Sequence, residues 1–239
     1  MSINPFDLAI IHYVNGFAGR SRAFDALIHG FANNYLLKGA PLMAMLYWAW
    51  FRKEKPAAAK NETRARVLAI CAASVLAPLL ARVIAAVTPF RVRPMNEPAL
   101  HFALPHFMSE GTAKIAAWSS FPSDNVALLF ALVAGVFALS RRLGFVALVI
   151  GTLGAFARVY SGMHYPTDVL AGAVLGAASF VLVDRTRLKP LIARPALMLL
   201  EKNPGLFYAF FFLATDQIAH VLWESFVIVA YIATGVHLH

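Results

Sequence analysis

Apolar runs close to the length of a bilayer crossing divide this chain of 239 residues. A helix needs about 20 consecutive apolar residues to cross the hydrocarbon core, and the runs here approach or exceed that length. Hydrophobic residues make up 60% of the chain and charged residues only 14%, whereas a soluble domain carries about 25% charged residues. The sequence therefore predicts an all-α, polytopic integral membrane bundle with about six transmembrane helices.

The apolar runs predict three parts of the chain. Residues 1–34 are apolar but interrupted, and we expect an N-terminal interfacial segment of one or two amphipathic helices. Residues 35–185 form a five-helix membrane core, and residues 186–239 form a cytoplasmic basic linker followed by a C-terminal transmembrane helix. The expected spans are 35–50, 67–87, 123–140, 143–160, 167–184 and 206–236.

Two of these spans carry residues with a special packing role. Gly172 and Gly176 stand at the four-residue spacing that lets a neighbouring helix approach closely. Asp216 and Glu224 are intramembrane carboxylates in the last span, at a helix interface or in a water-filled groove, and we favour the interface.

Basic residues between the apolar runs predict the orientation of the chain. They concentrate in 51–66, at 141–142 and in 185–194, and short basic loops face the cytoplasm. By alternation, the loop 88–122 and the short loop around His164 share the opposite face. We therefore expect a multi-pass protein of the bacterial inner membrane, with its site on the periplasmic or extracytoplasmic side.

The same topology excludes other classes of protein. The net charge of +9 is distributed on both sides of the apolar runs, so lipid headgroups explain it better than nucleic acid, and no nucleic-acid partner is expected. The single cysteine, Cys71, lies inside an apolar run, which predicts no disulfide framework and no thiol metal site. No cleaved signal peptide is expected. The sequence sets no expectation for the oligomeric state.

An Arg-x5-His-x3-Asp pattern joins Arg158, His164 and Asp168 between two apolar runs. A guanidinium binds phosphate oxygens bidentately, an imidazole attacks phosphorus, and a carboxylate fixes the tautomer of the imidazole. The pattern therefore suits phosphoryl transfer. Taken one at a time, each residue is better explained as an anchor at a helix end.

The loop 88–122 adds two arginines, Arg91 and Arg93, framed by Pro89 and Pro94. A stiff cationic turn loses little conformational freedom when it binds an anion. Arg91 alone is explained equally well as a snorkelling anchor.

The same loop closes with Ser123, Asp124 and Asn125 at the start of a predicted helix. Serine is an ordinary N-cap residue, and the free N–H groups of a helix N-terminus also bind anions. Local sequence leaves both roles of Ser123 open, cap and anion ligand.

These motifs resemble the three signatures of the type 2 phosphatidic acid phosphatase (lipid phosphate phosphatase) superfamily, over about residues 80–185. The resemblance implies a helical core, a site at the outer membrane face, and no metal or cofactor. It implies that His164 is the nucleophile and Asp168 its orienting partner. It also implies a set of phosphate-binding residues, in which Arg82 and Arg91 are the weaker candidates: Arg93, Arg158, Ser123, Asp124, Arg82 and Arg91.

The chain departs from the family pattern in two important places. Ala86 stands where the family usually has a basic residue, and Arg82 lies about one helical turn further upstream. Asn125 stands where the second motif usually ends in a histidine that protonates the leaving oxygen, and an asparagine cannot donate a proton for catalysis. His101 or His106, in the same loop, is the alternative acid.

The loss of this acid predicts the kind of leaving group. A phosphate monoester that leaves a diphosphate needs a proton less than an alkoxide does, because its second pKa is about 6. We therefore expect a lipid diphosphate substrate, with undecaprenyl diphosphate as the leading candidate, as in the bacterial undecaprenyl diphosphate phosphatases of this family.

Other functions stay open at this point. They are a phosphatidic acid or phosphatidylglycerophosphate phosphatase, a lipid phosphotransferase, and a catalytically impaired lipid-phosphate binder or transporter. Asn125 favours the last, whereas His164 and Asp168 together speak against it, because neither is needed merely to hold a phosphate. The expected partners are a membrane lipid phosphate or diphosphate and the bilayer itself.

Overall fold

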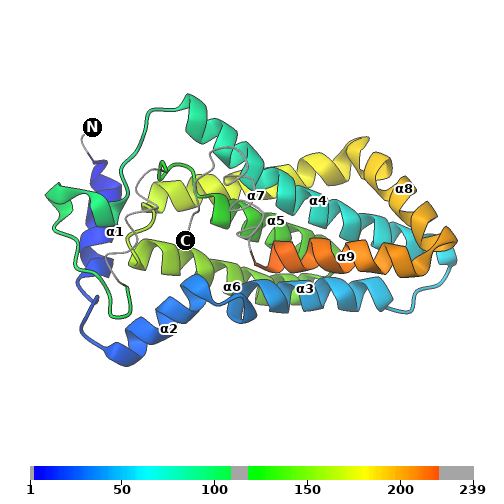
Figure 1. Cartoon of the computed structure of the whole chain (residues 1–239), viewed down its shortest axis with the longest axis horizontal. Helices are drawn as coiled ribbons and strands as arrows, with labels where there is room; N and C mark the ends of the chain where they lie inside the picture. Colours follow the sequence, from blue (N-terminus) through cyan, green and yellow to red (C-terminus); the bar gives the residue numbers. More distant parts are fainter. Residues whose placement is uncertain (1–2, 109–117, 221–239) are drawn as a thin grey trace.

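The computed structural model describes residues 3–108 and 118–220, and this part of the chain is all-helical. Most of the helices run along the long axis of the molecule, and α1 lies across one end (Figure 1). The elements are α1 (Pro5–Asn15), α2 (Arg22–Asn33), α3 (Tyr35–Phe51), α4 (Ala57–Val87), the short 3-10 turns η1 (Pro94–Asn96) and η2 (Pro98–Leu100), α5 (Asp124–Leu139), α6 (Arg141–Tyr160), α7 (Pro166–Arg185), α8 (Leu188–Lys202) and α9 (Pro204–Ala219).

The predicted helical membrane bundle is confirmed. Among the described residues α4, α6 and α7 are long and apolar enough to cross a membrane, and α5 is a shorter apolar helix. The spans expected at 35–50, 123–140, 143–160 and 167–184 agree with α3, α5, α6 and α7 to within two residues. The last expected span begins as α9, and its remainder, with Glu224, lies outside the described residues.

Two segments that were expected to be loops are helical. α4 begins at Ala57, so most of the expected basic loop 51–66 belongs to this helix. Three consecutive alanines start it, and Lys60, Glu62 and Arg64 are also good helix formers. The expected basic linker contains α8, which packs against α4 and α9. Ile192, Ala196 and Leu199 lie on the face of α8 that packs on the core, at the spacing of an amphipathic helix. Because α8 also carries basic residues, this apolar stripe was not recognised in the sequence.

The centre of the bundle is α5, which packs against α4, α6 and α7. α7 approaches α5 very closely at two glycines, as their spacing predicted. A Cβ on Gly172 would lie 2.5 Å from the carbonyl oxygen of Ser123, and one on Gly176 would lie 2.1 Å from that of Ala127. This approach brings the N-termini of α5 and α7 together, and the amide of Ser123 donates to the carbonyl of Asp168 at 3.1 Å.

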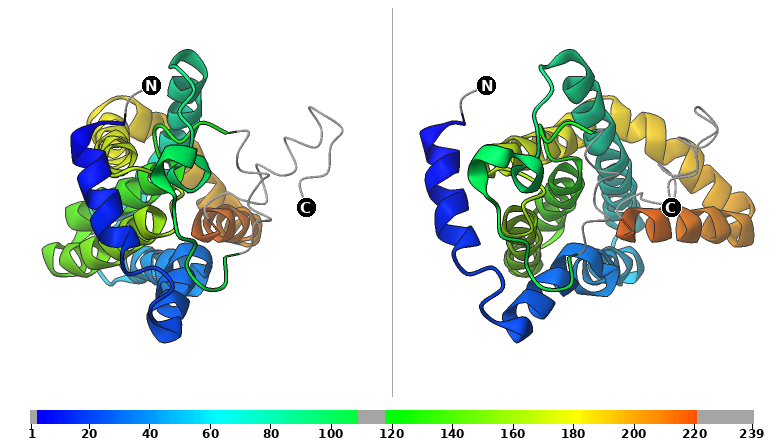
Figure 2. Two further views of the ribbon diagram at one scale, coloured as in Figure 1. Left: turned by 90° about the vertical axis from the view of Figure 1, so that its left-hand side faces the viewer. Right: turned by 60° about the vertical axis from the view of Figure 1, so that its left-hand side comes forward.

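The same end of the bundle collects the segments that surround these two N-termini. Figure 2 shows α1 and the loop 88–108 gathered at the end from which α5, α6 and α7 are seen nearly end-on. A small apolar cluster joins α1 to this end through Ile11, Leu100, Val159 and Tyr165. The polar residues singled out in the sequence lie in this region.

Candidate active site

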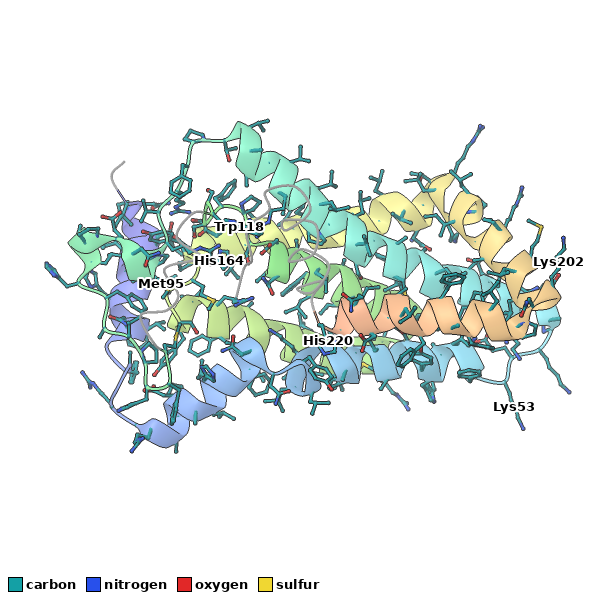
Figure 3. The ribbon with its side chains drawn as sticks, viewed as in Figure 1. Lys53, Met95, Trp118, His164, Lys202 and His220 are labelled. Atoms are coloured by element: carbon teal, nitrogen blue, oxygen red, sulfur yellow. The ribbon has the colours of Figure 1, made fainter. Side chains whose placement is uncertain are left out.

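His164 lies in the short turn between α6 and α7. The turn is closed by the amides of Met163 and His164, which donate to the carbonyl of Arg158, and Gly162 adopts φ +66 there. The imidazole is only 2% exposed. Figure 3 shows it near Met95 and Trp118, at the opposite end of the bundle from Lys53 and Lys202.

Hydrogen bonds define the tautomer of this histidine. Nδ1 lies 2.8 Å from the carbonyl oxygen of Ser120, which can only accept, so Nδ1 carries the proton. Nε2 therefore presents its lone pair, and Nη1 of Arg93 lies 3.5 Å from it. The nitrogen available for attack on phosphorus faces a guanidinium, the group that binds phosphate oxygens.

The charge state of His164 suits a nucleophile. Burial lowers the pKa of His164 well below its ordinary value of 6.5, and the charges of Arg93 and Arg158 lower that pKa further. Burial also lowers the pKa of Arg93 to about 10, so its guanidinium stays charged at neutral pH. The site therefore holds a neutral imidazole beside a cation.

Asp168, which the sequence predicted to orient His164, lies within ion-pair distance of the ring but makes no direct hydrogen bond to it. Its Oδ2 lies 3.9 Å from Nδ1, which is too long for a hydrogen bond, and accepts instead from the hydroxyl of Ser120 at 2.5 Å and the amide of Tyr165 at 2.8 Å. The carbonyl of Ser120 orients the imidazole directly. Sequence reasoning missed Ser120, because the run Ser119–Ser123 holds three serines and nothing local shows which one meets the histidine.

The two arginines expected to bind phosphate flank the histidine. Arg93, which is 5% exposed, donates through Nη1 to the carbonyl of Met163 at 2.8 Å, and Nη1 of Arg158 contacts the sulfur of the same methionine at 2.7 Å. The amide of Met95 also donates to the carbonyl of Gly162 at 2.9 Å. Two loops far apart in sequence are thus held together, as the topology predicted.

Ser123 occupies the N-cap position of α5, but its side chain makes no capping hydrogen bond. The hydroxyl is fully buried, and its Oγ has no hydrogen-bond partner among the described residues. A buried polar group without a partner is costly. This geometry favours the role of anion ligand over that of cap.

Asp124 and Arg82 neutralise each other, contrary to the expectation that both bind phosphate. Nη2 of Arg82 donates to Oδ2 of Asp124, and the guanidinium lies 4.3 Å from the ring centroid of Trp118. Asn125 donates to Oδ1 of the same carboxylate twice, from its backbone N–H at 2.7 Å and from its side-chain Nδ2 at 3.1 Å. A carboxylate repels phosphate, and the charge of Arg82 is balanced, so this geometry gives no support to direct phosphate binding by either residue.

Arg91 is also occupied by carboxylates. Nη1 donates to Asp168 and to the hydroxyl of Thr167 at 2.8 Å, while Nη2 donates to Asp7 at 2.6 Å. The guanidinium packs 4.0 Å from the ring centroid of Tyr165. Arg91 links two buried carboxylates, and this geometry gives no support to its predicted role as a phosphate ligand.

The two histidines considered as alternative acids lie in other surroundings. His101 is exposed, with left-handed backbone at φ 43. The amide and Nδ1 of His106 both lie 2.8 Å from Oδ2 of Asp25. No hydrogen bond among the described residues joins either one to His164, so the geometry gives no support to a second acid.

Metal ligands do not gather at this site. Over residues 3–108 and 118–220, no group of three or more His, Cys, Asp or Glu side chains could hold a metal ion. The donor nearest to Nε2 of His164 in the described part of the chain is the guanidinium of Arg93, which suits an anion.

Comparisons with known proteins agree with the motifs. The family model described as PAP2 superfamily matches residues 66–189. The "Bacitracin transport permease protein BcrC" of Bacillus licheniformis is 38% identical over 84 residues, which cover 35% of this chain and 41% of that protein. The "Undecaprenyl-diphosphatase BcrC" of Bacillus subtilis (strain 168) is 24% identical over 166 residues, which cover 70% of this chain and 76% of that protein. No solved structure matches.

Proposed function

We propose that this chain, which belongs to the PAP2 superfamily, removes the terminal phosphate of an isoprenoid diphosphate such as undecaprenyl diphosphate through a phosphohistidine intermediate. Membership of this family makes the chain a phosphatase that acts on lipid phosphates in a bacterial membrane. The substrate and the covalent step are the parts proposed here.

One observation carries the proposal: the unprotonated Nε2 of His164 is buried next to the guanidinium of Arg93. Nε2 attacks the terminal phosphorus, the bond from that phosphorus to the bridging oxygen breaks, and the lipid monophosphate leaves with that oxygen and its electrons. Arg93, Arg158 and the Ser123 hydroxyl stabilise the charge on the equatorial oxygens. Water then attacks phosphorus, the P–N bond breaks, and inorganic phosphate and the free imidazole result.

The position of Asn125 supports a diphosphate substrate. The side-chain amide of Asn125 hydrogen-bonds to Asp124 and cannot transfer a proton to the leaving oxygen. A lipid monophosphate leaves without strong acid catalysis because its second pKa is about 6, whereas an alkoxide does not. The B. subtilis relative is named for the same class of substrate.

The arrangement of charges supports a site on the extracytoplasmic face. Lys53 and Lys202 lie at one end of the bundle and His164 at the other (Figure 3). The end with Lys53 and Lys202, where the short basic segments lie, is the one expected in the cytoplasm. The lipid would then present its diphosphate from the outer leaflet.

The test is a substrate panel on the full chain in detergent micelles. We expect phosphate release from undecaprenyl diphosphate to exceed that from phosphatidic acid by at least about 100-fold, and His164→Ala to abolish it. Asn125→His should raise hydrolysis of phosphatidic acid more than that of the diphosphate. Equal rates on both substrates for the unaltered chain would contradict the leaving-group argument.

A second candidate function is that of a lipid-phosphate binder or transporter without turnover. Asn125 favours it, and the B. licheniformis relative is named a transport permease. Binding of the lipid diphosphate without phosphate release, and without a phosphorylated His164 after acid-free quenching, would support this function over hydrolysis.

A further inference from the structure

The N-terminal helix places a fully buried carboxylate beside the site. Asp7, in the first turn of α1, is 0% exposed although α1 lies across the end of the bundle (Figure 1). One turn later, Ile11 packs with Leu100, Val159 and Tyr165, and this tyrosine directly follows the proposed nucleophile. α1 is therefore docked on the segment that carries the nucleophile.

Asp7 caps a helix other than its own. Its Oδ1 accepts from the amide of Thr167 at 2.9 Å, and its Oδ2 accepts from the hydroxyl of Thr167 at 2.6 Å. Thr167 lies in the first turn of α7, where the free N–H groups of the helix carry partial positive charge. A carboxylate from α1 thus holds the beginning of the helix that carries Asp168.

Arg91 extends this contact to Asp168. Nη2 of Arg91 donates to Asp7 at 2.6 Å, while Nη1 donates to Oδ1 of Asp168. Both carboxylates are 0% exposed, so one guanidinium joins two desolvated anions. The Arg91 guanidinium is held in place by both carboxylates. Removal of the charge on Asp7 leaves it free to turn toward Asp168.

The second oxygen of Asp168 leads to the imidazole. Oδ2 accepts from the hydroxyl of Ser120, whose carbonyl accepts from Nδ1 of His164 at 2.8 Å. The hydroxyl and the carbonyl belong to the same buried serine, so the two hydrogen bonds are joined through one residue. A shift of Arg91 toward Asp168 would therefore move Ser120 and rotate the ring that must face phosphorus.

We propose that Asp7 is a positioning residue of the phosphatase: through Arg91 and Thr167 it places Asp168, and thereby Ser120 and the imidazole of His164. The N-terminal helix is then part of the catalytic unit. This inference rests on the proposed function, in which His164 is the nucleophile.

The first test is Asp7→Asn in the full chain, purified in detergent and assayed with undecaprenyl diphosphate. We expect kcat to fall about 10- to 100-fold, as for other small misplacements of catalytic groups. KM should change by less than about twofold, because Asp7 contacts no substrate. The rate of His164 phosphorylation in a single turnover should fall by the same factor, and Asp7→Glu should restore part of it.

The second test measures coupling between Asp7 and Arg91. If they act as one unit, the double variant Asp7→Asn/Arg91→Gln loses no more kcat than the worse single variant. A loss equal to the product of the two single losses would show that the residues act separately and would overturn the proposed path.

The matched control is Asp25→Asn. Asp25 is also 0% exposed and also belongs to the N-terminal segment, but its partners are Gly19, His106 and Tyr160. We expect the kcat of its folded fraction to stay within about twofold of the unaltered chain, because it contacts neither Arg91 nor Asp168. An equal loss in both variants would assign the effect to general loosening of the N-terminus and would overturn the positioning role.

The outcomes separate this inference from the proposed function. Unchanged kcat in Asp7→Asn together with an inactive His164→Ala overturns the positioning role alone, whereas an active His164→Ala overturns the proposed function. If Asp7→Asn yields too little folded protein, Asp7→Glu and Arg91→Lys give the same comparison: lowered kcat at constant KM supports the inference, and unchanged kcat overturns it.

Discussion

The two ends of the bundle both carry clusters of acidic and basic side chains, but they differ in burial. At the α8 end, Arg66 and Lys189 each lie 3.3 Å from the buried carboxylate of Asp184, but their own side chains are 29% and 19% exposed and that of Arg185 is 81% exposed. Because these cations reach solvent, their ion pairs are partly screened. Their charges are explained by membrane topology.

At the α1 end, the guanidinium that faces His164 is enclosed. Arg93 is 5% exposed, and at the same end Ser123 buries a hydroxyl that has no partner among the described residues. A buried hydroxyl needs a hydrogen bond. The comparison teaches that the number of basic residues does not identify an anion site; burial and unused donors do.

The largest expected effect separates the arginines of the two ends. Arg93→Ala should lower kcat/KM by at least about 1,000-fold, since an arginine that stabilises a transferring phosphoryl group contributes about that much. Arg66→Ala, at the other end, should leave kcat/KM within about twofold. The measurement is phosphate release from undecaprenyl diphosphate, and comparable losses in both variants would remove the distinction between the ends.

Two buried serines provide the next comparison. The Ser123 hydroxyl is free for a phosphate oxygen, whereas that of Ser74 in α4 donates to the carbonyl of Ile70 at 2.8 Å. A hydrogen bond to a charged group contributes about 1.5–3 kcal/mol, so Ser123→Ala should reduce kcat/KM roughly 10- to 150-fold. Ser74→Ala should change the melting temperature but not kcat/KM. An active Ser123→Ala would indicate that its hydroxyl does not contact phosphate.

The close approach of α7 to α5 is tested by adding a methyl group. Gly172→Ala brings a Cβ to 2.5 Å from the carbonyl oxygen of Ser123, whereas on Gly205 in α9 the nearest atom lies at 3.7 Å. Overpacking of this kind costs about 1–3 kcal/mol. We expect Gly172→Ala to lower both the melting temperature and the activity, and Gly205→Ala to lower neither. Activity lost at an unchanged melting temperature would point to a local effect on Ser123 alone.

The smallest expected effect concerns pH. The pKa of His164 lies well below 6.5 in the folded protein, so the unfolded chain binds more protons as the pH falls below 6.5. The neutral imidazole therefore contributes stability above 6.5 that is lost progressively as the pH falls toward the lowered pKa. The melting temperature without ligand should fall between about pH 7.5 and pH 5.5, and less so in His164→Asn. The same slope in both proteins would show that other groups cause it.

The pH dependence of kcat/KM should follow the pKa of His164. A histidine with an ordinary pKa of 6.5 would be half protonated at that pH, whereas His164 stays neutral there. We expect kcat/KM to hold its plateau through pH 6.5 and to fall only at lower pH. A midpoint at 6.5 would show that the imidazole is less enclosed than the structure describes.

The sequence by itself predicted most of the helices, an orientation in the membrane and the segments that meet at the site. Apolar length sets a transmembrane helix locally, basic loops set its direction, and short connections leave few ways to place His164 near Arg158. The helix α8 and the first turns of α4 were not predicted. A search for long apolar runs does not detect an amphipathic or alanine-rich helix whose surface is charged.

Only the tertiary structure decided which polar groups pair. Arg91 and Arg93 are two residues apart in one loop, yet one joins Asp7 to Asp168 and the other faces His164. The carbonyl of Ser120 accepts the hydrogen bond from His164 that was expected to go to Asp168. The physical reason is that a hydrogen bond depends on the direction of a side chain to within about an ångström, and contacts between residues 84 to 160 positions apart are set by the packing of whole helices, which no local pattern encodes.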